Sequence, residues 1–573
     1  MAKKKHNILL LVALLLWSQL NIHAQSNSIS SFSLESSDLQ RWESLQETLY
    51  LSSYPNKSWT EKAIQKDVRQ FRSAHSLNNN PSGAAPNLFS SIDYANIQRL
   101  KALHGIWYEN SSGMPATPMR EQPILRYFYK TKNNFFDVYS DHLYLAVNPV
   151  LGLEAHLHKD HIGYKNFRGI EAKGILFNRI GFYTKFGDNQ LYLDDYTQDI
   201  TTKERSLYGH DYARNLETNK YDLFEATAYV NVALYKDLLN VTAGYDRHFV
   251  GYGLRSLVID EEGAAQSFIN LQGRWEKWSY DFLYLELIDD YYTAGDQILP
   301  KKYGQIHQLN YDINHRIRVG LFEKSILASN TAFNPLSIIP IPGLQSVRQS
   351  TGSDIQSEMG LQAKALVTKG FTLYTQAFIK DLDWNNLGKN IFKNQWAAQL
   401  GFQYYNVFTI RNLDLQAEVN VVRPFAYSSY QSGYNYTHYN QPLAHPLGSN
   451  FIEAIAKMRY QPHPKINLFA IGSLAKRGEE RSNIYNGENP KTILSDDSKI
   501  PYHSLVSIWK NSHSYHQFFG RAWIQYEWSP SIFIHGGANY RHHWKGDFNT
   551  PTIQTIAPFI GLHWHFSNRI LMY

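Results

Sequence analysis

The sequence has no cysteine among its 573 residues. This absence excludes disulfide bonds, metal sites built from thiolates and a cysteine nucleophile. It also excludes a lipid-modified cysteine as the anchor of a mature chain. Catalytic signatures are missing as well: the chain has no G-x-S-x-G, H-E-x-x-H, phosphate-binding loop or dinucleotide fingerprint. We therefore expect a protein that is not an enzyme and that has no catalytic residues and no cofactor.

Long hydrophobic runs are absent from all but the first 24 residues. Lys3–Lys5 precede an apolar run from Ile8 to Leu20, and the small residue Ala24 follows. The run is short of the roughly 20 residues that span a bilayer as a helix. The pattern therefore predicts a secretory signal peptide over 1–24, cleaved after Ala24. No later run reaches the length of a spanning helix.

A large excess of one charge is also absent. The formal net charge is +6, and it falls to +3 when the three lysines of the leader are removed. So small a surplus does not indicate a nucleic-acid partner. Aromatic residues, in contrast, are abundant, with 40 Tyr, 30 Phe and 13 Trp. An exported chain rich in rings but poor in apolar runs is typical of a fold in which apolar and polar side chains alternate.

Such alternation is present from about residue 140 onward. Apolar side chains share one parity in Phe224–Leu234 and again in Leu413–Val421, with polar residues at most of the other positions. Because successive strand side chains point to opposite faces, each stretch has one apolar and one polar face. Tight connections alternate with long polar ones down the chain. The tight ones lie near residues 236–238, 276–277, 315–316, 368–370, 406–412, 461–465 and 527–531.

This rhythm is typical of bacterial outer-membrane barrels, which have short periplasmic turns and long extracellular loops. Aromatic residues beside the tight turns, such as Trp275 and Trp528, suit an interfacial girdle. We therefore predict an all-β fold over 121–573, a transmembrane antiparallel β-barrel of about 18 strands running from near Leu143 to near Phe566. The expected location is the cell outer membrane of a Gram-negative bacterium. Outer-membrane lipid and the barrel-assembly machinery are the expected partners of a monomer.

Residues 25–120 show a different pattern. Apolar residues have helical spacing in Trp59–Phe71 and in Ser90–Gly105, with a linker rich in Asn and Pro at 78–87 between them. We interpret 25–120 as a small, partly helical periplasmic subdomain at the barrel mouth. The alternative is a disordered leader with no docking role.

One long outer connection carries the main candidates for ligand binding. The stretch YSSYQSGYNYTHYNQPLAHPLGSN (427–450) has five tyrosines and no charged side chain. A phenol offers a flat apolar face and one polar tip, which suits the C–H faces and hydroxyls of a sugar. The alternative is that the rings fold inward as a constriction or lid. The polysaccharide-binding candidates are Arg423, Tyr427, Tyr430, Tyr434, Tyr436, His438, Tyr439 and His445.

Two further groups of residues are weaker candidates. Arg247 and Arg255 lie in a glycine-containing connection, where they could bind an anionic sugar or lock the loop through an internal Arg–Asp pair. Glu154, His156 and His158 share one strand face and could hold a transition metal. They could equally be ordinary polar groups of the lumen. Because no partner ligand can be identified from spacing, no metal is predicted.

Four parts of the sequence carry a resemblance to a known family: PILRYFYKTKNNFFDVYSDHLYLAVNPVL (123–151), FRGIEAKGILFNRIGFYT (167–184), YDRHFVGYGLRSLVI (245–259) and VRPFAY with NYTHYNQPLAHPLGSNF (422–427 and 435–451). They resemble the Wzi-like capsule-assembly family, in the version that also resembles the gliding-motility protein RemB. The resemblance covers roughly residues 120–566. It implies an 18-stranded outer-membrane barrel with a helical periplasmic bundle, acting as a lectin that holds capsular polysaccharide at the cell surface. The RemB-like version implies an adhesin or support for motility.

These observations predict a barrel that binds or anchors surface, or capsular, polysaccharide through long extracellular loops. Two alternatives stay open. One is a gliding-motility or secretion accessory, or an adhesin, whose barrel is a scaffold for partners. The other is a porin-like channel, because a barrel of about 18 strands is wide enough to conduct solutes unless it is plugged.

Overall fold

The computed structural model describes most of the barrel and two parts of the N-terminal region. The signal peptide predicted at 1–24, the helix predicted at 59–71 and the domain boundary predicted at 120 lie outside the described residues. The described residues are 33–49, 89–103, 128–129, 133–140, 142–159, 161–177, 179–211, 213–235, 238–289, 299–327, 339–350, 352, 355–386, 389, 391–478, 486–494, 514–529, 531–545 and 553–566.

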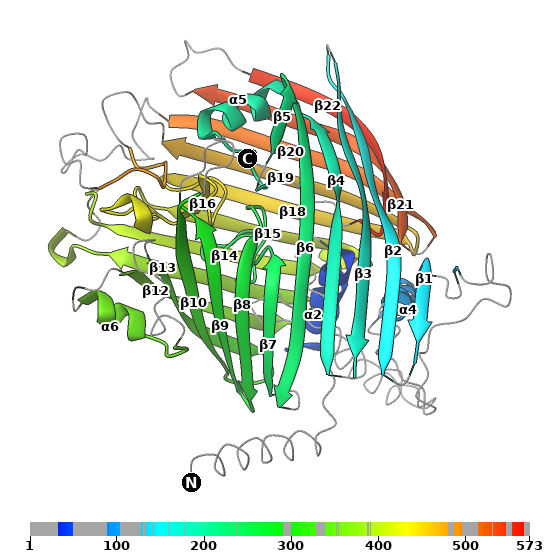
Figure 1. Cartoon of the computed structure of the whole chain (residues 1–573), viewed down its shortest axis with the longest axis horizontal. Helices are drawn as coiled ribbons and strands as arrows, with labels where there is room; N and C mark the ends of the chain where they lie inside the picture. The colour runs from blue at the N-terminus through cyan, green and yellow to red at the C-terminus, as the bar shows by residue number, and fades with distance from the viewer. Residues whose placement is uncertain are drawn as a thin grey trace, which may run out of the picture.

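Eighteen antiparallel strands form a closed barrel (Figure 1). The strands are β2 (Leu143–Leu157), β3 (Ile162–Leu176), β4 (Ile180–Tyr192), β6 (Lys220–Tyr235), β7 (Leu239–Asp246), β8 (Gln266–Trp275), β9 (Trp278–Ile288), β10 (Lys301–Asp312), β11 (Ile317–Leu327), β12 (Ile355–Thr368), β13 (Phe371–Asp381), β14 (Gln395–Tyr405), β15 (Leu413–Val422), β18 (Phe451–His463), β19 (Ile466–Gly478), β20 (Ser514–Ser529), β21 (Ile532–Lys545) and β22 (Ile553–Trp564). The barrel closes where β2 pairs with β22. The predicted number of strands is confirmed.

Short elements decorate the barrel. Strands β1 (Phe136–Tyr139) and β5 (Arg214–Glu217) pair with β2 and β6. The tight turns predicted at 276–277, 315–316, 368–370, 406–412 and 461–465 are present within the described residues. The remaining elements are α5 (Asp195–Glu204), α6 (Leu344–Ser350), η4 (Trp384–Asn386), η5 (Val407–Thr409), η6 (Ser432–Tyr434), β16 (Thr437–His438) and β17 (Gln441–Pro442).

The two faces of a strand have opposite environments, as the alternation predicts. On β6, Phe224 is 64% exposed on the outside of the barrel, whereas Asn231 is 3% exposed on the inside. Trp275 and Trp528, beside tight turns, are also largely exposed on the outside. A barrel surrounded by lipid requires apolar side chains on its outer face and polar side chains facing inward. Among the described residues, no helix is both long enough and apolar enough to cross a membrane.

Two helices, α2 (Leu34–Gln46) and α4 (Ser91–Leu103), lie within the barrel near its tight turns (Figure 1). The Ser33 hydroxyl caps α2 by accepting a hydrogen bond from the backbone N–H of Ser36 at 3.0 Å. Apolar residues of both helices pack together and against Tyr405 of β14. The helix predicted over Ser90–Gly105 is therefore confirmed as α4, whereas α2 was not predicted. Tyr405 thus faces the lumen and belongs to this helical core.

Candidate functional site

The connection between β7 and β8, residues 247–265, folds into the barrel. Leu257 and Val258 are completely buried. The side chain of Gln376 on β13 accepts a hydrogen bond from the N–H of Leu257 at 2.8 Å and donates one to the carbonyl of Val250 at 3.0 Å. Because four strands separate β8 from β13, this connection reaches across the lumen.

A carboxylate on the barrel wall anchors the same connection. Glu418 of β15 accepts hydrogen bonds from the backbone N–H groups of Leu254 and Arg255 at 2.7 and 2.9 Å. It also accepts one from the hydroxyl of Tyr374 at 2.9 Å. Gly253 permits this close approach, since a side chain there would overlap the Glu418 carboxylate. The connection is thus held by charge-assisted hydrogen bonds inside the lumen.

The tyrosine-rich connection between β15 and β18 lies against this first connection. The hydroxyl of Tyr427 donates to the carbonyl of Leu257 at 3.2 Å, and that of Tyr436 donates to the carbonyl of Val258 at 2.8 Å. The ammonium of Lys324 lies 4.6 and 4.2 Å from the centroids of these two rings. Together the two connections form a hydrophobic core within the lumen.

These contacts decide where the predicted ligand-binding residues lie. Of the two placements that the sequence left open, the inward-packing one describes most of these residues. Tyr430, at 51% exposure, is the exposed member of the set. Arg247, Arg423 and Tyr439 are partly exposed. The buried members are Tyr427, Tyr434, Tyr436, His438, His445 and Arg255.

Arg255 is locked into an internal ion-pair network. It is 0% exposed and pairs with Glu262 and, at 3.5 Å, with Glu453. Glu453 also binds the Nε2 atom of His445 at 2.8 Å. Burial works against the charge of Arg255, but Glu262 and Glu453 outweigh it and raise the pKa of the guanidinium. The loop-locking alternative therefore fits Arg255. Arg247 also stabilises this connection, because its guanidinium donates hydrogen bonds to the carbonyls of Gly263 and Gly209.

His438 connects the two outer connections to the barrel rim. Its Nδ1 atom accepts a hydrogen bond from the backbone N–H of Ile288 at 3.0 Å, and its Nε2 atom lies 2.9 Å from the carbonyl oxygen of Ala265. This pairing requires a neutral ring with its proton on Nε2. Burial lowers the pKa of His438 to about 4; the Ala265 carbonyl opposes this change and the nearby Lys302 adds to it.

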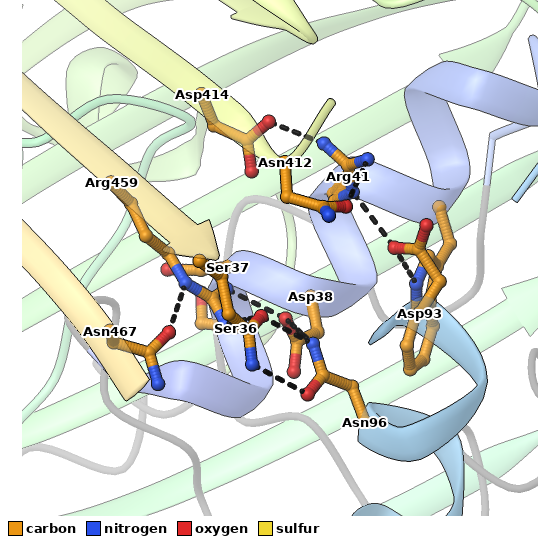
Figure 2. A network of polar contacts seen from close by, with 12 residues as sticks. Ser36, Ser37, Asp38, Arg41, Asp93, Asn96, Asn412, Asp414, Arg459 and Asn467 are labelled. Atoms are coloured by element: carbon orange, nitrogen blue, oxygen red, sulfur yellow. Dashed lines mark hydrogen bonds and ion pairs between the residues drawn. The ribbon is translucent and has the colours of Figure 1, made fainter. Parts of the chain in front are cut away.

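The two N-terminal helices lie at the inner end of the lumen, and Figure 2 shows the polar network that holds them. Arg41 of α2 pairs with Asp93 of α4 at 2.8 Å and with Asp414 of β15. Asp38 of α2 pairs with Arg459 of β18 at 2.6 Å. These contacts cross-link both helices to the barrel wall.

The charges of this network stabilise one another. Burial works against the charge of Arg41, but Asp414 and Asp93 outweigh it and raise the pKa of the guanidinium. Burial similarly disfavours ionised Asp93, yet Arg41 and the hydrogen bonds from Ser90 lower the pKa of its carboxyl below the usual value. The buried Arg41–Asp93 pair that joins the two helices is therefore held in its charged form.

Comparisons with known proteins concern the fold. Neither protein-family models nor curated protein sequences match this chain. Among solved structures it is similar to Wzi of Escherichia coli, an outer membrane protein involved in group 1 capsule assembly and a carbohydrate-binding β-barrel. The TM-score is 0.55 at 12% identity, over 95% of this chain and 100% of Wzi. The fold is similar to that of Wzi.

Other solved structures overlap this chain less completely. The outer membrane protein OprD of Pseudomonas aeruginosa is 9% identical, with a TM-score of 0.39 over 74% of this chain and 92% of OprD. OccAB4 of Acinetobacter baumannii is 8% identical, with a TM-score of 0.39 over 74% of this chain and 98% of that protein.

The weak metal candidates do not assemble as the sequence spacing implies. His156 does lie close to Glu154, with 2.9 Å between its Nε2 atom and a carboxylate oxygen. His158, in contrast, stacks on His161 with 4.7 Å between ring centroids. Glu154 instead meets His535 of β21 at 2.7 Å. Sequence analysis missed His535, since its proximity depends on how the last strands pair with β2.

Proposed function

We propose that this protein is an outer-membrane barrel that binds surface polysaccharide at its extracellular face and does not conduct solutes. The observation that carries the proposal is the core that the two outer connections, 247–265 and 423–450, build inside the lumen. A general diffusion channel needs a continuous polar path through its lumen. In this barrel, apolar residues and buried ion pairs occupy the lumen instead. The whole-length likeness to a carbohydrate-binding barrel supports the same function.

The outer face has features suited to a neutral glycan. Tyr430 is exposed, and its neighbour Ser429 is held by a bridge to Ile493 of another outer connection. The N–H of Leu494 donates to the carbonyl of Ser429 at 2.8 Å. Two connections far apart in the sequence thus hold the Tyr430 backbone in place. A binding surface that is already ordered loses less conformational entropy when it takes up a ligand.

The test compares two exposed rings at opposite ends of the barrel. Tyr430→Ala should weaken binding of polysaccharide purified from the producing strain by about 5- to 30-fold, which corresponds to the loss of about 1–2 kcal/mol from one aromatic contact. Trp275→Ala, beside a periplasmic turn, is the matched control and should bind normally. Equal binding by both variants, or equal weakening, would contradict the proposal for this loop.

Two measurements separate the alternatives. Purified protein in planar bilayers should stay silent, and steady large openings would favour the channel. Cells lacking the protein should release polysaccharide into the medium. Retained polysaccharide together with lost surface gliding would instead favour the motility accessory, which stays a prediction.

A further inference from the structure

The strand register brings three metal-ligating side chains together where the barrel closes. Gly561 of β22 is the register partner of Glu154 on β2 and also of His535 on β21. His563 lies two residues further along β22, on the same face as Gly561. The three side chains are buried within the barrel. Pairing of the last two strands with the first therefore creates a cluster that no single segment contains.

The geometry of this cluster suits a small cation. Glu154, His535 and His563 each offer one ligand atom, and these atoms lie within 4.8 Å of one another. The two imidazole rings are 4.1 Å apart between centroids. A side chain at position 561 would overlap the His535 ring, so Gly561 provides the space in which the ring lies. Ligands of a tetrahedral ion with bonds of about 2.1 Å are roughly 3.4 Å apart, so side-chain shifts of about 1 Å complete the site.

The donors indicate the class of metal. We propose that Glu154, His535 and His563 bind one divalent first-row transition ion such as Zn²⁺, because two imidazoles and one carboxylate are the donors that such ions prefer. The Nδ1 atom of His535 is buried and has no hydrogen-bond partner within the described part of the chain. A buried nitrogen of this kind is destabilising unless something binds it.

The surroundings of Glu154 resemble the outer hydrogen-bond partners of a metal site. Arg521 donates to one carboxylate oxygen of Glu154 at 2.8 Å, and His156 lies 2.9 Å from the other. Such partners orient a ligating carboxylate. Arg521 also partly neutralises the charge of Glu154. The site therefore attracts a dication less strongly than an unpaired carboxylate would. We therefore expect moderate affinity, with His156 and Arg521 tuning it.

The location suggests what the ion does. The seam ladder joins Leu151–His156 of β2 to Phe559–Trp564 of β22, whereas β2 pairs with β3 along Leu143–Leu157. The seam is therefore shorter than the next ladder. An ion held by residues of β2, β21 and β22 would cross-link the first and last strands of the barrel. The site is independent of polysaccharide binding, since it lies in the wall and not in the outer connections.

The experiment uses untagged, full-length mature protein in detergent, treated with a chelator and then titrated with Zn²⁺ against a chromophoric competitor. Wild-type protein should bind one equivalent, and His535→Ala and His563→Gln should each weaken binding at least tenfold. His543→Ala is the matched control. Like His535, His543 is a buried, inward-facing residue of β21, but it lies outside the cluster. Zn²⁺ should also raise the temperature at which the wild-type barrel loses its folded electrophoretic mobility.

Folding of each variant is checked by the same mobility assay. If His535→Ala does not fold, Co²⁺ bound to the wild-type protein still tests the site, because its visible absorption reports a tetrahedral nitrogen and oxygen environment. The proposal would be overturned if wild-type protein bound no stoichiometric Zn²⁺. It would also be overturned if the folded His563→Gln variant bound Zn²⁺ as tightly as His543→Ala.

Discussion

Removing the Arg41 guanidinium should release the inner helices from the barrel. Arg41 is 4% exposed and pairs with Asp93 and Asp414. Arg41→Ala leaves the buried Asp93 carboxylate without its main counter-charge, and breaking a buried pair in this way costs about 3–5 kcal/mol. Arg316→Ala is the control. Arg316 pairs with Glu47 at 2.7 Å beside the same helix, but its side chain is 41% exposed. Such a pair contributes about 0–1 kcal/mol.

The absence of cysteine makes a clean assay possible. Ser44→Cys places a single thiol on α2, at a buried position where the hydroxyl of Thr372 donates to Ser44 at 2.9 Å. A maleimide reaches this thiol only when α2 leaves the wall. Since about 1.4 kcal/mol changes an equilibrium tenfold, Arg41→Ala should speed labelling by about 100- to 5,000-fold. Arg316→Ala should speed it by less than about 5-fold.

Two results would refute this reasoning. The first is that Arg41→Ala labels as slowly as the parent protein. The second is that both arginine variants accelerate labelling equally, which would mean that burial of the pair does not determine its contribution. An unchanged heat-modifiable mobility for each variant would establish that the barrel itself remains folded.

The remaining predictions concern the outer connections and the wall. Acidification should loosen the connection that carries His438, because its folded pKa of about 4 is below the usual value near 6.5. The neutral ring stabilises the fold fully above pH 6.5, and up to about 3 kcal/mol is lost as the pH falls towards 4. Protease cleavage of 423–450 in proteoliposomes should rise over this range in wild type but stay flat in His438→Gln. Gly537→Val should lower the yield of folded barrel, because a side chain there would overlap the carbonyl of Ala522 on β20. Gly273→Ala should fold normally, since the nearest atom to its added carbon is 3.9 Å away.

Helix prediction shows where sequence patterns succeed and fail in this chain. The pattern in Ser91–Leu103 was recognised because apolar residues recur at helical spacing. Helix α2 was missed because it lies in a lumen lined with polar groups, where Asp38, Arg41 and Glu43 are buried. Its apolar residues at helical spacing, Leu39, Trp42 and Leu45, are few and are interrupted by these buried charges, so the apolar stripe is too short to give a clear signal.

The barrel itself was determined by the sequence. Each strand points successive side chains alternately towards lipid and towards the lumen. Which of the two a residue faces can be read from neighbours one or two positions away. The number of strands, the tight turns, and the positions of the first and last strands therefore followed from local patterns. Only the tertiary structure decided that Tyr427 turns inward onto Leu257, and that Glu154 meets His535. Partners in these contacts are 170 and 381 residues apart. Their encounter depends on how the wall closes and how the loops fold inside it, which no short-range periodicity encodes.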